Sequence, residues 1–313
     1  LKYDRMASKF VIDQMSGSLS FIVSMCDDPY SIRITDVIRH TAEVVKVSKV
    51  VLSLTATDSH LFILVEDALL ALKLEALRDA PLVASIDISS PSPFKLVSDP
   101  EYAVTVKKTE VNELERNDRR ISSSNMLLTS THSRVFLVDQ RGEVFQRIYR
   151  IFESSSVPTN GVIQLQVPEG MERITMMMGG ADHILALTET GKVWAMGTGS
   201  HGELGVGDVC SSPTEFVECD LPEDVIVEDI AVGAWHSVVI TDAKDVYVWG
   251  WNRDGQLGDD QTEKCVYSPT PLDIDDVISI EARECATVLT TKDELGHVKV
   301  IVYGCNLIHY EDD

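Results

Sequence analysis

One segment of 26 residues occurs twice in this chain, and the two copies begin 53 residues apart. The first covers residues 180–205 (GADHILALTETGKVWAMGTGSHGELG) and the second covers residues 233–258 (GAWHSVVITDAKDVYVWGWNRDGQLG). The copies are identical at 9 of 26 positions, where ordinary residue frequencies would give about two. Four of the nine shared residues are glycines and only one is a histidine, so the repetition preserves backbone geometry rather than a reactive group. A period of this size indicates a stacked or circular array of one small unit.

Each copy has the pattern of a β-hairpin that ends in a glycine-rich turn. In the first copy, residues 184–187 form a short apolar run, as expected of a strand buried on both faces. Residues 188–192 supply turn chemistry, and residues 193–196 return as a second strand. The second copy follows the same order. Leu204 and Leu257, near the ends of the copies, are expected to enter the core.

Four strands per unit at this period are typical of a β-propeller blade, so we predict an all-β chain forming a single propeller over residues 1–313. Weaker copies occur downstream at residues 286–306 and upstream at the hairpin 135–145. Residues 1–125 are predicted to form degenerate blades with a polar loop at about 107–125, and residues 126–313 to form the recognisable repeats. A further hairpin is expected at 50–63, and the adjoining residues 64–77 fit a helix by composition or strands by alternation, with strands preferred.

The chain is acidic, with a net charge of −23 that is unevenly distributed. Residues 205–313 carry 24 acidic and 6 basic side chains, whereas residues 1–204 carry 26 and 21. An acidic surface repels DNA phosphates, so direct DNA binding by the C-terminal half is not expected. Such a surface attracts basic partners such as histone tails, although a purely solubilising role explains it equally well.

The six cysteines are scattered singly, and the sequence contains neither a Cys-x-x-Cys pair nor an Asn-x-Ser/Thr sequon. This pattern favours reduced thiols, packed as small core residues, in a nuclear or cytosolic protein. No run of 18 apolar residues is present, so no membrane-spanning helix is expected.

Two features imitate catalytic or cofactor motifs. Residues 197–202 (GTGSHG) match the dinucleotide pattern G-x-G-x-x-G, but no helix pattern follows, and a helix N-terminus is what holds the pyrophosphate. His183 and His236 occupy the same repeat position, where a ring nitrogen is expected to bond the neighbouring blade's backbone. No catalytic residue, metal site or cofactor is predicted. The structural repeat positions are Gly180, His183, Gly197, Gly202, Gly205, Gly233, His236, Gly250, Gly255 and Gly258.

A partner-binding surface is predicted where loops leave the strand ends of the second copy. Its candidate residues are Trp235, Trp251, Asn252 and Asp254, because aromatic side chains on exposed loops are common contact residues. Trp249 lies in the middle of a predicted strand and is expected to pack in the core instead.

The shared pattern of a histidine, a Gly-x-Val-[Trp/Tyr] strand start and a closing Gly-[Glu/Gln]-Leu-Gly resembles the repeat of the regulator of chromosome condensation (RCC) family. The resemblance covers about residues 171–306, and Lys244 departs from it where the first copy has Gly191. It implies a propeller of four-stranded blades, seven by the family pattern and six as the alternative. Residues 231–238, 246–252 and 254–257 are similar to a small family member that partners a JmjC-domain oxygenase.

The resemblance implies a nuclear, non-enzymatic scaffold that binds a JmjC-domain 2-oxoglutarate oxygenase in chromatin regulation and chromosome segregation, as one member of a heterodimer. The alternative is a guanine-nucleotide exchange factor for a Ran-like GTPase, against which the acidic surface argues. A propeller lyase or hydrolase is disfavoured because no catalytic set is visible. An open ring would expose strand edges, so residues 9–22 are expected to close the last blade.

Overall fold

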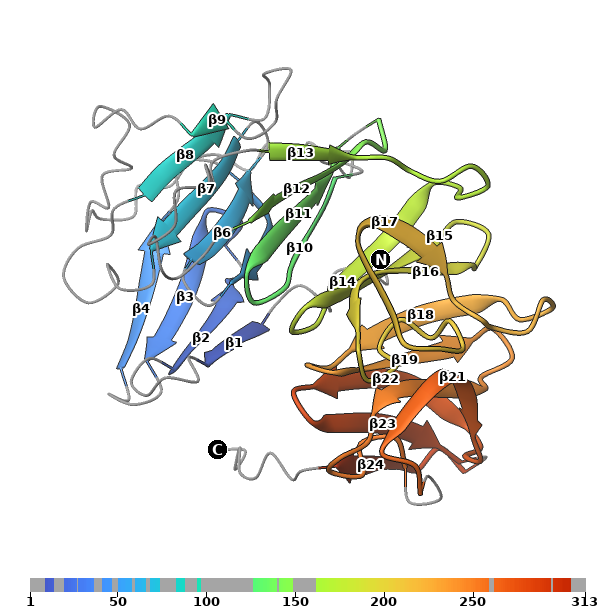
Figure 1. The fold of residues 1–313 in the computed structure, drawn as a ribbon. Coiled ribbons are helices and arrows are strands. Elements are labelled where there is room, and N and C mark those ends of the chain that lie inside the picture. Colours follow the sequence, from blue (N-terminus) through green and yellow to red (C-terminus); the bar gives the residue numbers. More distant parts are fainter. Residues whose placement is uncertain are drawn as a thin grey trace. The chain divides into compact units, whose positions relative to one another are not determined.

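The computed structural model describes residues 9–13, 20–26, 28–36, 41–46, 50–57, 60–65, 68–73, 83–87, 95–96, 126–139, 141–148, 162–258, 262–293 and 295–304. All regular structure in these residues is β-strand, in 24 strands arranged as six antiparallel sheets (Figure 1). The chain divides into two compact units. Unit 1 comprises residues 1–129 and 133–164, and unit 2 comprises residues 130–132 and 165–313.

Unit 1 contains three sheets, each built from strands that follow one another in the sequence. The first has β1 (Lys9–Asp13), β2 (Ser20–Met25), β3 (Ser31–Asp36) and β4 (Thr41–Lys46). The second has β5 (Val51–Ala56), β6 (His60–Val65), β7 (Ala68–Lys73), β8 (Val83–Asp87) and β9 (Lys95–Leu96). The third has β10 (Leu127–Ser130), β11 (Arg134–Val138), β12 (Val144–Ile148) and β13 (Val162–Leu165), of which the ends of β10 and β13 belong to unit 2.

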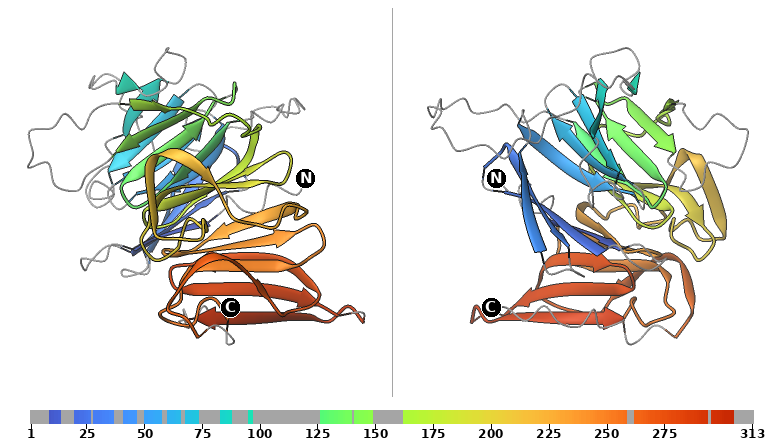
Figure 2. Two further views of the ribbon diagram at one scale, coloured as in Figure 1. Left: turned by 45° about the vertical axis from the view of Figure 1, so that its right-hand side comes forward. Right: turned by 90° about the vertical axis from the view of Figure 1, so that its left-hand side faces the viewer.

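Unit 2 contains the two clear repeats and their continuation, again as meandering sheets. The first sheet has β14 (Ile174–Gly179), β15 (His183–Thr188), β16 (Val193–Gly199) and β17 (Cys210–Glu218). The second has β18 (Val227–Val232), β19 (His236–Thr241), β20 (Val246–Trp251) and β21 (Cys265–Leu272). The last has β22 (Val277–Arg283), β23 (Ala286–Lys292) and β24 (Val298–Gly304). Within the unit, these sheets lie one after another in sequence order (Figure 2).

The repeat produces the same register in successive sheets. His183 pairs with Gly197 across β15 and β16, and His236 pairs with Gly250 across β19 and β20. Gly197 and Gly250 have φ values of 121° and 108°, a region that L side chains rarely adopt. A Cβ at Gly197 would lie 2.3 Å from the Asp182 carbonyl oxygen. The glycines at this position are therefore required by both backbone conformation and close approach.

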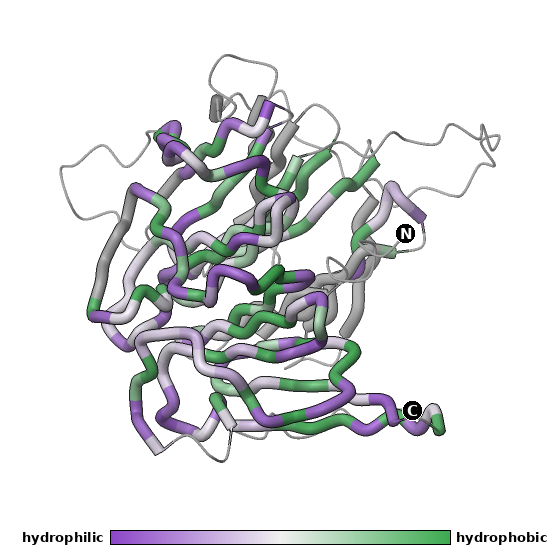
Figure 3. Tube along the Cα trace, turned by 90° about the vertical axis from the view of Figure 1, so that its right-hand side faces the viewer, coloured by the Kyte–Doolittle hydropathy of each residue, from purple (hydrophilic) through white to green (hydrophobic). Residues whose placement is uncertain are grey.

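The core of unit 2 lies between its sheets. Leu185, Val193 and Ala195 of the first sheet pack with Ile230 and Val239 of the second, and all five are at most 2% exposed. Hydrophobic residues concentrate along the strands, whereas many of the turns between them are hydrophilic (Figure 3). β15 and β19 are buried along their whole length, which explains the short continuous apolar runs in the sequence.

The expected core residues are confirmed. Leu204 and Leu257 are 1% and 0% exposed, and Trp249 is fully buried. The hairpins expected at residues 50–63 and 135–145 are present as β5–β6 and β11–β12. The ambiguous run from residue 64 onward forms the end of β6 and then β7, so the strand interpretation was correct. The polar loop expected at about 107–125 lies outside the described residues.

Two expectations are corrected. The N-terminal strands do not complete the last sheet: β1 pairs with β2 and β2 with β3, so they form a sheet of their own, while β22–β24 form a three-stranded sheet in the described residues. The cysteines are not all reduced, because Cys285 is disulfide-bonded, whereas Cys26, Cys219 and Cys265 are free. The described part of the chain contains six sheets, and a count of seven blades stays a prediction.

Candidate interaction surface

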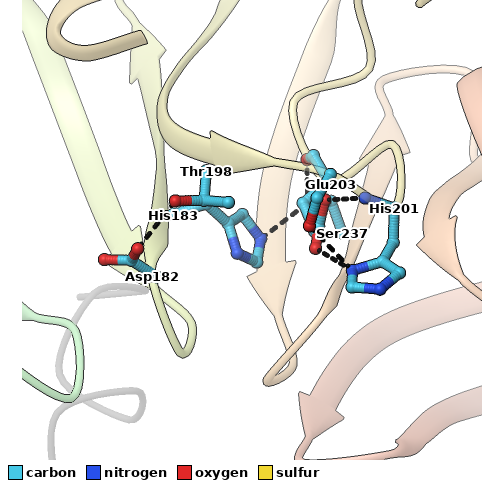
Figure 4. A network of polar contacts seen from close by, with 7 residues as sticks. Asp182, His183, Thr198, His201, Glu203 and Ser237 are labelled. Carbon is cyan, nitrogen blue, oxygen red and sulfur yellow. Dashed lines mark hydrogen bonds and ion pairs between the residues drawn. The ribbon is translucent and has the colours of Figure 1, made fainter. Parts of the chain in front are cut away.

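The glycine-rich turn of one sheet docks onto the next sheet through the main chain of Glu203 (Figure 4). Its carbonyl oxygen accepts hydrogen bonds from Ser237 Oγ at 3.0 Å and from Trp249 Nε1 at 2.9 Å. The His183 ring reaches the same hydroxyl, with 3.2 Å between His183 Nε2 and Ser237 Oγ. These contacts join the sheet β14–β17 to the sheet β18–β21 by buried polar groups.

The same arrangement recurs one sheet further along. Thr287 Oγ1 donates to the Gln256 carbonyl oxygen at 2.7 Å, and His236 Nε2 lies 2.9 Å from Thr287 Oγ1. Because each hydroxyl gives its hydrogen to a carbonyl oxygen, each histidine must donate from Nε2, which fixes the neutral tautomer. The sequence predicted a backbone partner, but the hydrogen-bond partner of both rings is a hydroxyl side chain.

Burial keeps both histidines neutral. It lowers the pKa of His183 from 6.5 to about 3, with a smaller contribution from the charge of His236. It lowers the pKa of His236 from 6.5 to about 4, and the Ala286 backbone opposes this shift. Neutral, buried rings that link sheets have a structural role.

Two of the four predicted contact residues come together on the surface. Trp235 lies between β18 and β19, and Trp251 ends β20; their ring centroids are 6.4 Å apart at an interplanar angle of 89°. His201, from the glycine-rich turn of the preceding sheet, stacks on Trp251 at 4.7 Å and meets Trp235 edge-on at 5.9 Å. All three side chains are partly exposed. We call Trp235, Trp251 and His201 the aromatic cluster.

The other two predicted residues differ in exposure. Asp254 is exposed and follows Trp251 of the aromatic cluster by three residues in the sequence. Asn252 is 8% exposed; its Oδ1 accepts from the Leu257 N–H at 3.0 Å, and its Nδ2 donates to the Glu263 carbonyl at 3.2 Å. Asn252 thus holds the turn in shape and leaves little side-chain surface for a partner.

Sequence reasoning missed His201 and Arg253. His201 is fixed by Glu203, whose buried carboxylate accepts the His201 backbone N–H at 2.8 Å and lies 3.0 Å from His201 Nδ1 (Figure 4). The Arg253 guanidinium lies over the Trp251 ring, 5.6 Å from its centroid. The sequence could have indicated His201, because it stands at the same repeat position as Asp254, which was predicted as a contact residue.

The polar groups near His201 do not form a nucleophilic relay. Ser200 Oγ and Glu203 Oε1 both approach the same ring nitrogen, His201 Nδ1, at 3.1 and 3.0 Å. A serine nucleophile and its orienting carboxylate need opposite nitrogens of the imidazole.

Among the described residues, no group of three or more His, Cys, Asp or Glu side chains is placed to hold a metal ion, and no helix is long and apolar enough to cross a membrane. Residues 197–199 end β16 and turns follow, as predicted for a repeat turn rather than a cofactor loop.

These sheets, joined by buried histidine and hydroxyl contacts, define the class of the protein: an all-β protein with the four-stranded antiparallel blades of RCC1-type β-propellers. The chain is similar in structure to human WBSCR16, with a TM-score of 0.60 and 14% identity, covering 88% of this chain and 71% of that one. It is also similar to yeast RCC1 (Prp20), solved bound to Kap60, with a TM-score of 0.60 and 17% identity, covering 91% and 68%. At these identities the likeness shows the fold alone.

Family models assign the repeat itself. Residues 190–240 and 245–285 match the model of the regulator of chromosome condensation (RCC1) repeat, and residues 227–256 match a second model of that repeat. The segment 190–285 therefore carries RCC1 repeats, as the sequence pattern predicted.

The similarity to curated relatives is partial. The chain is 38% identical over 78 residues to human RCC1 domain-containing protein 1, covering 25% of this chain and 20% of that protein. It is 36% identical over 95 residues to the ultraviolet-B receptor UVR8 of Arabidopsis thaliana, covering 30% and 21%. The chain thus matches about a fifth of the length of these relatives.

Proposed function

We propose that this protein is a non-enzymatic nuclear scaffold that binds a JmjC-domain 2-oxoglutarate oxygenase and acts in chromatin regulation and chromosome segregation. The observation that carries the proposal is the 38% identity to RCC1 domain-containing protein 1 over the matched residues, together with the resemblance of residues 231–238, 246–252 and 254–257. A heterodimer with this oxygenase is the expected assembly.

The aromatic cluster, with Asp254 beside it, is the surface at which we place the partner. Trp235 and Trp251 are held in a fixed T-shaped pair and are partly exposed, and tryptophans in such settings often carry a large share of binding energy. The loops that present them are set by the rigid strands β18–β20, so little order is lost on binding. The acidic residues of the C-terminal half would also attract a basic chromatin partner such as a histone. The charge distribution in the sequence led to the same expectation.

The first experiment is affinity capture of the tagged protein from nuclear extract, followed by mass spectrometry. A JmjC-domain oxygenase is expected in stoichiometric amount. Trp251→Ala should weaken its binding by roughly 2 kcal/mol, whereas Tyr30→Ala should not change it, because Tyr30 is an exposed aromatic of unit 1 outside the cluster. Loss of binding counts only if the variant melts like the parent protein. Capture without any such oxygenase would contradict the proposal.

The alternative function is nucleotide exchange on a Ran-like GTPase, through insertion of a loop rather than covalent chemistry. The same capture experiment separates the two functions. Recovery of such a GTPase only after EDTA has removed its nucleotide, with faster nucleotide release on adding this protein, would favour the exchange factor. The 24 acidic against 6 basic residues of the segment 205–313 argue against it.

A further inference from the structure

The outer surface of the aromatic cluster is already occupied by a cation from the chain itself. The Arg253 guanidinium lies 5.6 Å from the Trp251 ring centroid, within the range of a cation–π contact. Arg253 is exposed, so this contact is not imposed by close packing of a core. The Trp251 ring therefore has a face that accepts a guanidinium group in water.

The surroundings of this face are acidic. Asp254 is exposed and adjoins Arg253. Glu284 is also exposed, and its carbonyl oxygen accepts the Ala234 N–H at 2.8 Å, which places it next to the residue that precedes Trp235. Seven charged side chains stand at the described positions among residues 253–276, and five of them are acidic. A cation arriving at the cluster thus meets two aromatic rings and nearby carboxylates.

The cluster is also held in position before any partner arrives. His201 stacks on Trp251 at 4.7 Å, and the fully buried carboxylate of Glu203 holds His201 through its backbone N–H and Nδ1. The rings therefore need little rearrangement to receive a ligand. The preceding sheet lacks this chemistry, because the residues that align with Trp235 and Trp251 are Asp182 and Thr198, which bond each other at 2.7 Å.

We propose that the aromatic cluster binds an arginine side chain of a partner protein, and that Arg253 stands in for this arginine in the free protein. The proposal rests on the proposed function only in assuming that the chain binds proteins. Arg253 is then a competitor, so removing it should strengthen binding of an external arginine. A merely structural Arg253 would not behave in this way.

The test uses the four tryptophan indole N–H signals of the whole chain in a proton–nitrogen NMR spectrum. The probe is a capped peptide, Gly-Gly-Arg-Gly-Gly, and its control carries citrulline, which has the same shape without the charge. The arginine peptide should shift the signals of Trp235 and Trp251 but not those of Trp194 and Trp249, which are 7% and 0% exposed. Citrulline should shift neither pair.

Arg253→Ala should strengthen binding of the arginine peptide about twofold to fivefold, the range expected for one exposed cation–π contact. Lys299→Ala is the matched control, because it also removes one exposed positive charge but lies on β24, in another sheet. An equal gain in affinity for the arginine peptide in both variants would show that the change in net charge is the cause, and it would overturn the proposal. Trp251→Ala should weaken binding of the arginine peptide by a similar factor. If Trp251→Ala does not fold, the comparison of Arg253→Ala with Lys299→Ala still tests the proposal.

The two proposals fail separately. If neither indole signal moves with the arginine peptide while the JmjC-domain oxygenase is still captured, the arginine site is wrong and the scaffold function stands. If the signals move but no such oxygenase is captured, the arginine site stands and the assignment of the partner is wrong. Equal shifts with the arginine and citrulline peptides also overturn the arginine site.

Discussion

Buried histidines link one repeat to the next through side-chain hydrogen bonds. Each ring is neutral in the folded state at neutral pH and donates from Nε2 to a hydroxyl of the following sheet. Their conservation of position in the two copies is explained by this contact alone. The histidines are therefore structural counterparts of the repeat glycines, and they also make folding sensitive to acid.

Acidification should unfold the protein through these two rings. Below pH 6.5 the unfolded chain protonates both histidines, whereas the folded chain resists until about pH 4 at His236 and about pH 3 at His183. The unfolded state thus binds more protons, and stability falls as the pH is lowered through this window. We expect a loss of roughly 1.4 kcal/mol per pH unit for each histidine, measured by urea unfolding at a series of pH values.

The control for this prediction is the double variant His183→Gln with His236→Gln. Glutamine keeps an N–H donor near the hydroxyls but does not titrate, so the slope of stability against pH between 6.5 and 4 should become flatter. An unchanged slope in the double variant would assign the acid sensitivity to other groups.

Element by element, the hairpin turns show how the two copies reach one conformation with different residues. Gly191 and Lys244 occupy the same turn position, and their φ values are 82° and 74°. In both turns the N–H of this residue donates to the carbonyl of a threonine, Thr188 or Thr241. The departure of Lys244 from the family pattern therefore leaves the backbone unchanged and places a lysine in a left-handed conformation.

Lys244→Gly should relieve this strain. A non-glycine residue in the left-handed region costs roughly 1–2 kcal/mol, while the exposed ion pair between Lys244 and Glu228 contributes at most about 1 kcal/mol. We expect the free energy of unfolding to rise by about 1 kcal/mol, measured by denaturant titration.

Lys244→Ala serves as the control, because it loses the ion pair and keeps the strain, so it should not stabilise the protein. In the first copy, Gly191→Ala should destabilise, since its Cβ would lie 2.5 Å from Ile226 Cγ2. Equal stability of the glycine and alanine variants at position 244 would show that the left-handed backbone carries no strain there.

At the scale of the whole molecule, the main feature is a large and unevenly distributed negative charge. The net charge of −23 includes −18 from residues 205–313, given 24 acidic and 6 basic side chains there. Exposed pairs such as Lys192–Glu218 and Arg283–Glu281 neutralise a few of these carboxylates. The excess negative charge repels itself in the compact state and attracts basic partners.

Sodium chloride should therefore stabilise the protein. Screening shortens the range of charge repulsion from about 10 Å at 0.1 M to about 3 Å at 1 M ionic strength. The melting temperature is expected to rise over this interval, and to rise equally in sodium and potassium chloride if screening is the cause. A melting temperature that is flat or falls with salt would show that the exposed ion pairs outweigh the repulsion.

The sequence alone was sufficient for the parts of this protein that depend on local pattern. The period, the strands, the glycine turns and the burial of Leu204, Leu257 and Trp249 all follow from residues near one another in the chain, as does the RCC1 repeat. The choice of Trp235 and Trp251 as exposed aromatics also followed from their place at strand ends, although binding at them stays a prediction.

Only the tertiary structure decided which distant residues meet. His201 reaches Trp251 across two sheets, each histidine finds its hydroxyl on the next sheet, and Asn252 turns inward to hold its loop. The pairing of β1 with β2, rather than with the last sheet, and the disulfide at Cys285 likewise escaped prediction. The physical reason is common to all of these: strand pairing and side-chain packing between sheets depend on how whole elements dock, and short-range sequence patterns do not encode that docking.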